Sequence, residues 1–490
     1  MKAVRAPQTT AVFISAALAL ASGAALRVWM LRKFFEVRDD SELYGGLAKN
    51  LLQHGRYALT DGSGALHSTL IRLPGYPLFL AACFRLFGME NYWSAAVVQI
   101  ALAVLGWVLL AMFAVRITGD PLSRGRKGAL KWVTSAPAQA TLWLAALCPF
   151  TGIYDAEPLT ESLSLFCIAL ALWSAARFLE SGGWANALCF TAAVTYSALL
   201  RPDGALLGVA FVPPFLFQLL GSLKSSRAPS SRRLSVARAG DRKLSLAMVC
   251  LILAIAPFAA WTWRNWRAFH VIQPLAPRYA TDPGENTWPG FQRWMKTWCL
   301  DFVSTYEIYW NVPGAPIEIS KLPGRAFDSP VHRDETEAIV RVYESNGMEL
   351  SPAIDARFAQ LAEERIAAHP LRYYVILPLG RVADMWLRPR VENLPIDLDW
   401  WVYSHHRVET RFSWFYAGVN AFYLLLAVVG LCLRPRMWPW MLAYMLLRSL
   451  LLATIEAPEA RYTIECFPMV FTLGGVAISR FCSHFAGRHC

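Results

Sequence analysis

Residues 38–88 read RDDSELYGGLAKNLLQHGRYALTDGSGALHSTLIRLPGYPLFLAACFRLFG and connect two long apolar segments of the chain. Two adjacent carboxylates, Asp39 and Asp40, stand at the start of this stretch, and an amphipathic helix is predicted to follow over residues 41–54. A charged group this close to hydrocarbon costs free energy, so in a membrane protein it usually serves a function. The stretch therefore places the expected chemistry at a membrane surface.

The composition of the whole chain is that of a membrane protein. Of its 490 residues, 56% are hydrophobic and 17% are charged, whereas charged residues make up about 25% of ordinary soluble domains. Several segments approach the roughly 20 consecutive apolar residues that a helix needs to cross a bilayer. We therefore expect an all-α polytopic membrane protein.

Hydropathy predicts ten membrane spans. Lysines and arginines gather in three connecting segments, 116–131, 224–243 and 434–436, which all lie on the same side of a ten-span membrane protein. Basic loops mark the cytoplasmic side, so the acidic loops at the opposite ends of the spans are expected to face outward. The predicted spans are 10–30, 92–116, 135–151, 158–178, 184–200, 204–222, 244–264, 412–432, 437–455 and 462–480.

The chain is expected to divide into three parts. Residues 1–264 form an N-terminal transmembrane catalytic module, whose first external loop is 31–91. Residues 265–411 form an external loop region with surface helices, and residues 412–490 form the C-terminal transmembrane helices.

Helix signals stand out within the external region. Ser351 followed by Pro352 predicts an N-cap and the first turn of a helix that runs to Ala368. A second helix is predicted over 332–346. The stretch 371–387 is interpreted as a helix lying on the membrane surface, with a membrane span as the alternative.

The charge and cysteine patterns exclude two other classes of protein. Much of the net charge of +12 lies in the segment 221–243, which stands between two apolar spans and is therefore expected to be a cytoplasmic loop and not a nucleic-acid-binding face. The ten cysteines form no Cys-x-x-Cys motif and no cluster with histidine, so neither a zinc site nor a disulfide framework is indicated. His405 and His406 with Asp397 and Asp399 are a weak metal signal, because no helical i,i+4 pair or cysteine accompanies them.

An ordered series of short motifs resembles the GT-C membrane glycosyltransferases, in particular the protein O-mannosyltransferase (dolichyl-phosphate-mannose-dependent) and aminoarabinose-transferase group. The resemblance implies a GT-C-like bundle of about ten transmembrane helices with external amphipathic helices and a long external loop region. The motifs are Asp40-Ser-Glu-Leu-Tyr44, Arg72-Leu-Pro-Gly-Tyr-Pro77, Thr160-Glu161, Leu200-Arg201-Pro202-Asp203-Gly204, Trp263-Arg264-Asn265, His369-Pro370 and Glu459-Ala-Arg461-Tyr462.

The resemblance also implies an activity: inverting transfer of a sugar from a polyprenyl-phosphate-linked donor, on the external (periplasmic) face of the inner membrane. Such a transfer needs a base for the acceptor proton and a cation to neutralise the departing lipid phosphate. The match to the family's Asp-x-x-x-Tyr motif makes Asp40 the expected catalytic base and Asp39 the alternative. Either carboxylate could instead be an N-cap or a first-turn acid of the helix over 41–54.

Three arginines in the matched motifs are expected to bind the donor phosphate: Arg72, Arg201 and Arg461. A guanidinium can hold two phosphate oxygens at once. The alternative for Arg72 is an interfacial arginine that extends its charged end into water.

Four further residues are expected to bind the acceptor or a cation: Glu157, Glu161, Tyr44 and Tyr76. The two glutamates are four apart and are predicted to share one helix face, where they could orient an acceptor or hold a divalent cation. Pairing with an arginine of the same external cluster is the alternative. No other cofactor is expected, and the sequence assigns no set of metal ligands.

The expected partners are the lipid bilayer, the polyprenyl-linked donor and an acceptor that is a protein, a lipid or a polysaccharide. Two other functions remain open: a transporter or flippase of lipid-linked saccharides, and a non-catalytic subunit that binds polyprenyl lipid. A transporter predicts ionisable residues at mid-span and inverted repeats. The predicted spans carry almost no charge at mid-depth, with Arg448 as the exception, which favours the enzyme.

Overall fold

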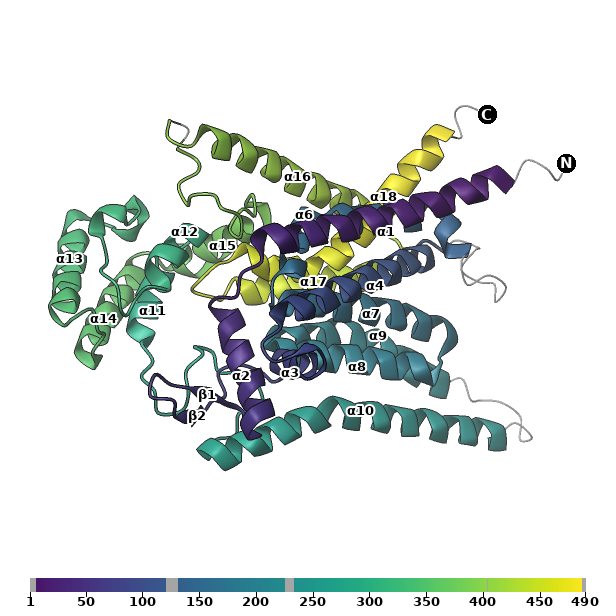
Figure 1. Ribbon diagram of the computed structural model, residues 1–490, viewed down its shortest axis with the longest axis horizontal. Coiled ribbons are helices and arrows are strands. Elements are labelled where there is room, and N and C mark those ends of the chain that lie inside the picture. Colours follow the sequence, from purple (N-terminus) through teal and green to yellow (C-terminus); the bar gives the residue numbers. More distant parts are fainter. Residues whose placement is uncertain (1–5, 120–130, 225–232, 403, 487–490) are drawn as a thin grey trace. The chain divides into compact units, whose positions relative to one another are not determined.

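The computed structural model describes residues 6–119, 131–224, 233–402 and 404–486, and these residues form helices joined by loops (Figure 1). Strands β1 (Ala58–Thr60) and β2 (Leu66–Ser68) form a two-stranded antiparallel sheet with Leu59 opposite His67. The predicted all-α fold class is confirmed. The basic segments 116–131 and 224–243, which oriented the predicted spans, lie partly outside the described residues.

The chain forms two compact units. The first comprises residues 1–283, 422–445 and 464–490, and the second comprises residues 284–421 and 446–463.

Long apolar helices make up most of the first unit. In it α4 packs against α5 and α7, α7 packs against α8, and α18 packs against α5. The helices are α1 (Ala6–Phe34), α2 (Asp40–His54), α3 (Gly75–Phe87), α4 (Tyr92–Thr118), α5 (Ala136–Leu147), α6 (Pro149–Ala156), α7 (Thr160–Ser181), α8 (Trp184–Leu200), α9 (Ala205–Lys224), α10 (Arg233–Phe269) and α18 (Phe467–Ala486), with 3₁₀ turns at Lys131–Thr134 and Pro202–Gly204.

Six helices of the described chain are long and apolar enough to cross a membrane, judged by length and composition. They overlap six of the ten predicted spans, and shorter apolar helices cover the predicted spans 184–200 and 437–455. The protein is therefore an integral membrane protein. The six are Thr10–Phe34, Tyr92–Thr118, Glu161–Ser181, Ser245–Phe269, Arg407–Cys432 and Ala460–Cys482.

The predicted single span over 135–151 is wrong. Helix α5 ends at Leu147, and α6 begins at Pro149 after an extended residue, Cys148, with φ −65° and ψ 115°. Proline has no N–H to continue a helix and disfavours helical backbone in the residue before it. The helix is therefore broken at a point where hydropathy alone predicts one continuous span.

Helix α2 confirms the amphipathic helix predicted over 41–54. Its buried face, which includes Tyr44 and Ala48, packs with Tyr76 and Leu80 of α3 in one apolar cluster. Gly55 ends the helix in the left-handed conformation, with φ 64°, that glycine adopts without strain.

The turn of the hairpin after α2 is stabilised by hydrogen bonds within the turn itself. In its turn, the Asp61 carboxylate accepts hydrogen bonds from the backbone N–H groups of Ser63 and Ala65, each at 2.9 Å. Such bonds stabilise a turn that aspartate favours. The hairpin returns the chain to the start of α3.

The first unit also contains a fully buried ion pair that links α1 to α6. Arg27 Nε lies 3.2 Å from Asp155 Oδ2, and the side chains are 0% and 2% exposed. The Arg27 guanidinium also donates to Thr151 Oγ1 at 3.1 Å and stacks 4.5 Å from the ring of Trp107. Ser162 Oγ donates to the other Asp155 oxygen at 2.8 Å. Both charges are thus paired and hydrogen-bonded, as burial requires.

The second unit has a core of its own, which includes Trp294, Trp298, Tyr343 and Phe358. Helices α16 and α17 have residues in both units. The helices are α11 (Pro289–Lys296), α12 (Phe302–Ser304), α13 (Pro330–Ser345), α14 (Pro352–Ala368), α15 (Leu377–Leu387), α16 (Arg407–Cys432) and α17 (Trp438–Leu452), with short 3₁₀ or π turns at Thr305–Tyr309, Ile319–Lys321, Gly324–Ala326, Arg372–Ile376 and Ala460–Cys466.

Two predicted helices of this unit are confirmed. Helix α13 covers the stretch predicted over 332–346, and α14 begins at Pro352 with Ser351 Oγ accepting from the N–H of Ile354. The ambiguous stretch 371–387 becomes a π turn followed by α15, and the helices long and apolar enough to cross a bilayer do not include it. Its Arg381 is fully buried in the unit and donates to the carbonyl of Cys299 at 2.8 Å.

The buried pair of Arg27 and Asp155 yields a stability prediction. Arg27→Met leaves the Asp155 charge buried without its partner, which costs about 3–5 kcal/mol of folding free energy. The thermal unfolding midpoint of the purified protein in detergent should fall, and the double variant Arg27→Met/Asp155→Asn should recover part of the loss. Arg32→Met, an exposed residue of the same helix, is the control. A midpoint for Arg27→Met equal to that of wild type would contradict the assignment.

Candidate functional site

Asp40 and Arg72, the predicted base and the predicted phosphate ligand, form an ion pair in the first unit. Arg72 Nη2 donates to Asp40 Oδ1 at 2.6 Å, and each side chain is 24% exposed. Asp40 is the first residue of α2, and Arg72 lies in the loop that leads into α3. The pair is open enough for a ligand to reach it and covered enough for its charges to act strongly.

Tyr44 lies one helical turn after Asp40, buried beside the pair. Burial, followed by the negative charge of Asp40, raises the pKa of Tyr44 to about 12. Its phenol therefore keeps its proton at neutral pH and can act as a hydrogen-bond donor. The charges of Glu161 and Arg201 also act on this group, so a second ion pair lies close to the same tyrosine.

This second pair is part of a network around Arg201. The guanidinium lies 2.9 Å from Glu161, 3.2 Å from Glu465 and 3.5 Å from Asp203. Glu161 and Glu465 are almost completely buried. For Glu161, pairing with an arginine was the open alternative, and the structure shows that pair.

Glu465 was missed by the sequence reasoning. It lies four residues after Arg461, at the start of a predicted span. A carboxylate inside an apolar segment is a signal that could have found it. Its partner Arg201 stands 264 positions earlier in the chain, so the pairing itself is visible only in the folded molecule.

The prediction that Glu157 and Glu161 share one helix face is wrong. Glu157 follows the end of α6 with extended backbone, φ −101° and ψ 145°, and Glu161 lies in the first turn of α7. Pro158 separates them, and a residue that precedes proline is disfavoured in the helical region. Both side chains are buried, but they belong to different helices.

Asp39 does not cap α2 with its side chain. It stands at the N-cap position with φ 48° and ψ −116°, and its carboxylate makes no capping hydrogen bond. The side chain is exposed. Asp40, in contrast, is a first-turn acid of α2 as well as the partner of Arg72.

Tyr76 is completely buried, and its ring centroid lies 5.0 Å from that of Tyr44. Its hydroxyl donates to Gln99 Oε1 at 2.5 Å, and Gln99 Nε2 donates to the carbonyl of Glu157 at 2.7 Å. These bonds connect α3, α4 and the break after α6. The structure thus gives Tyr76 a packing role beneath Tyr44.

Arg461 belongs to the second unit, where it pairs with Glu459 at 2.5 Å. Its guanidinium also lies 5.5 Å from the ring centroid of Tyr462. The phosphate candidates of the first unit are Arg72, which pairs with Asp40, and Arg201, whose charge acts on Tyr44.

Arg264, in the Trp-Arg-Asn motif, holds the loop that carries Arg72. Its guanidinium donates to the carbonyls of Thr69, at 2.6 Å, and of Tyr57. The Tyr57 hydroxyl donates in turn to the carbonyl of Arg72 at 3.0 Å. A second tie comes from Asp282, which accepts from the N–H of Leu70 at 2.7 Å. The position of Arg72 therefore depends on α10.

Gly75 of the Pro-Gly-Tyr-Pro run allows the start of α3 to approach the end of α8. A Cβ at this position would lie 2.6 Å from the carbonyl oxygen of Leu199, which is too close. The Tyr196 hydroxyl donates to the Gly75 carbonyl at 3.0 Å. Arg201 directly follows α8, so this contact helps to bring the Arg72 loop near Arg201.

The weak metal signal of the sequence is partly realised in the second unit. His406 lies with Asp397 and Asp399 in a group whose potential ligand atoms are within 4.8 Å of one another, and His405 is not a member. One ring nitrogen of His406 is 3.3 Å from Asp397 and 2.9 Å from Glu409, and the other is 3.1 Å from Asp399. The His406 ring is thus already surrounded by three carboxylates.

The role of Arg264 leads to a prediction about the Arg72 loop. Arg264→Gln removes the guanidinium contacts to Thr69 and Tyr57, so the backbone amides of residues 55–73 should exchange hydrogen for deuterium at least about tenfold faster. Arg267→Gln, an exposed residue on the same helix, should leave this exchange unchanged. Equal exchange in the Arg264 variant and in wild type would show that the loop is held by other contacts.

Comparison with protein-family models finds no match, and comparison with curated proteins finds none either. Among solved structures, the chain is similar to ArnT from Cupriavidus metallidurans, bound to undecaprenyl phosphate in one crystal structure and in the apo state in another. The identities are 15% and 14% and the TM-scores 0.35 and 0.36, and each match covers 96% of this chain and 77% of ArnT.

Proposed function

We propose that this protein is a polyprenyl-phosphate-dependent glycosyltransferase of the GT-C type. It would act on the external, periplasmic face of the inner membrane. The observation that carries the proposal is the ion pair of Asp40 and Arg72, which joins a carboxylate base to a phosphate-binding cation at the end of an apolar helix bundle. The ordered motif series supports the same function.

In the proposed reaction, Asp40 accepts the proton of the acceptor hydroxyl or amine. The acceptor atom then attacks the anomeric carbon from the face opposite the lipid phosphate. The bond from that carbon to the phosphate oxygen breaks, and its electron pair leaves with the phosphate. Transfer therefore inverts the configuration of the sugar, and Arg72 stabilises the charge that develops on the departing phosphate.

The geometry of the pair suits both tasks. A guanidinium has five N–H donors, so Arg72 can hold Asp40 and a phosphate at the same time. Its positive charge also favours the ionised form of Asp40, which is the form that a base requires. Binding of the donor phosphate then draws part of the Arg72 interaction away from Asp40 and makes this carboxylate a better proton acceptor.

The neighbouring groups receive supporting roles in the proposal. Tyr44 can donate a hydrogen bond to the donor phosphate or the acceptor, and Arg201 is a further phosphate ligand. Arg201 lies within 3.5 Å of three carboxylates. In the proposal, Glu161 also binds a cationic group, either a divalent cation or an amine of the acceptor.

The first test is transfer from a radiolabelled polyprenyl-phosphate sugar pool in membranes that contain wild type or Asp40→Asn at equal expression. Loss of a general base lowers a rate by about 10²–10⁴-fold, so transfer by the variant should fall by at least 100-fold. Asp39→Asn tests the alternative base, and Glu36→Gln, an exposed carboxylate of the same loop, is the matched control.

Other outcomes of this assay would replace the assignment. Equal transfer by wild type and Asp40→Asn would remove Asp40 as the base and direct attention to Asp39 or Glu161. Absence of transfer from every polyprenyl carrier supplied would favour the transporter or the lipid-binding subunit.

A further inference from the structure

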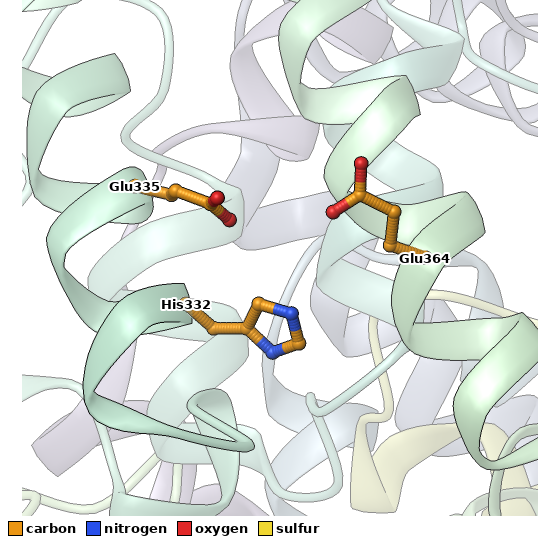
Figure 2. A group of neighbouring side chains, drawn as sticks. All are labelled: His332, Glu335 and Glu364. Carbon is orange, nitrogen blue, oxygen red and sulfur yellow. The ribbon is translucent and has the colours of Figure 1, made fainter.

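Three side chains with metal-binding atoms converge between α13 and α14 of the second unit, outside the site described above. His332 and Glu335 are three residues apart on α13, a spacing that places them on the same helix face. Glu364 extends from α14, and Figure 2 shows the three side chains directed toward one another across the space between the helices. Their potential ligand atoms lie within 4.8 Å of one another.

A carboxylate lies on the other side of the His332 ring. His332 Nδ1 lies 3.8 Å from Asp328 Oδ2, a distance longer than a hydrogen bond. Asp328 is itself held by Arg372, which donates to its two oxygens at 2.5 and 2.9 Å. Arg365 Nη2 also lies 3.4 Å from Asp328 Oδ1, so the partners of Asp328 in this group are arginines.

His332 Nδ1 has no hydrogen-bond partner among the residues that the structure describes. A neutral imidazole carries its proton on one ring nitrogen and presents a lone pair on the other. In Figure 2 one nitrogen of the ring is turned toward the two glutamates, so a lone pair on this nitrogen can face the same space as their carboxylates.

The two glutamates lack basic partners. In the part of the chain that the structure describes, no lysine or arginine forms an ion pair with Glu335 or Glu364. Glutamates nearby on the same helices do pair, Glu337 with Arg341 at 2.6 Å and Glu363 with Arg293 at 2.8 Å. A lone pair and two carboxylates that face one another are favoured by a cation between them.

We propose that His332, Glu335 and Glu364 bind a divalent first-row transition metal ion such as Zn²⁺. One imidazole nitrogen and two carboxylate oxygens suit such an ion, whereas Mg²⁺ and Ca²⁺ take oxygen ligands. Ligands at about 2.0–2.2 Å from zinc require these atoms to approach one another more closely than 4.8 Å. Both glutamate side chains are exposed and can make this adjustment. The bound ion joins α13 to α14 and leaves its fourth position to water.

The group around His406 does not carry the same proposal. Both ring nitrogens of His406 already face carboxylates, at 3.3, 2.9 and 3.1 Å, so contacts of the ring with these carboxylates explain the group without an ion. In the His332 group, Asp328 engages only the far side of the ring.

The test measures zinc bound to the full-length protein in detergent, by equilibrium dialysis against Zn²⁺ followed by elemental analysis. Wild type should hold one more tightly bound zinc per chain than Glu335→Gln or Glu364→Gln, and an excess of Mg²⁺ should not displace it. Glu337→Gln is the matched control on α13, because Glu337 pairs with Arg341 and is not one of the ligands.

A second readout follows the joining of the helices. Zinc should raise the thermal unfolding midpoint of wild type and of Glu337→Gln, because a ligand bound to the native state stabilises that state. It should not do so for the two ligand variants. Equal zinc content in wild type and both ligand variants, or displacement by Mg²⁺, would overturn the proposal. Neither readout depends on transferase activity.

Discussion

The ion pair of Asp40 and Arg72 links the first residue of α2 to the loop that enters α3, and the other contacts of the site serve to hold these two residues in place. The contact between the Asp40 carboxylate and the Arg72 guanidinium, at 2.6 Å, requires the start of α2 and the loop before α3 to keep fixed positions. The apolar face of α2, with Tyr44 packed on Tyr76, fixes the first segment. Arg264 fixes the second through the carbonyls of the loop.

Several helices and apolar spans could be predicted from the sequence, because the sequence patterns that indicate them are local. The amphipathic helix over 41–54, the helix that begins at Pro352 and the apolar spans each follow from patterns within a few helical turns. The identity of Asp40 and Arg72 as site residues came from the motif resemblance. Their direct contact spans 32 positions and required the folded chain.

The predictions from the sequence that were wrong or missing have two physical causes. Hydropathy does not detect breaks in a helix. The breaks before Pro149 and Pro158 were therefore not predicted, although proline restricts the backbone of the residue before it in a predictable way. Residue spacing along the chain does not identify partners that are far apart in sequence, so neither the pairing of Arg27 with Asp155 nor that of Arg201 with Glu465 was predicted. Both pairs join charges that stand in or next to apolar segments of the sequence.

The most direct test of the account is the binding of undecaprenyl phosphate to purified wild type, Arg72→Met and Asp40→Asn in detergent. If Arg72 holds the donor phosphate while Asp40 acts only as a base, the arginine variant should bind at least about tenfold more weakly, a change of about 1.4 kcal/mol. Asp40→Asn should bind at least as tightly as wild type, because it removes a negative charge beside the phosphate. Binding by Arg72→Met that equals wild type, or loss of binding in Asp40→Asn, would contradict the division of roles on which the proposed mechanism depends.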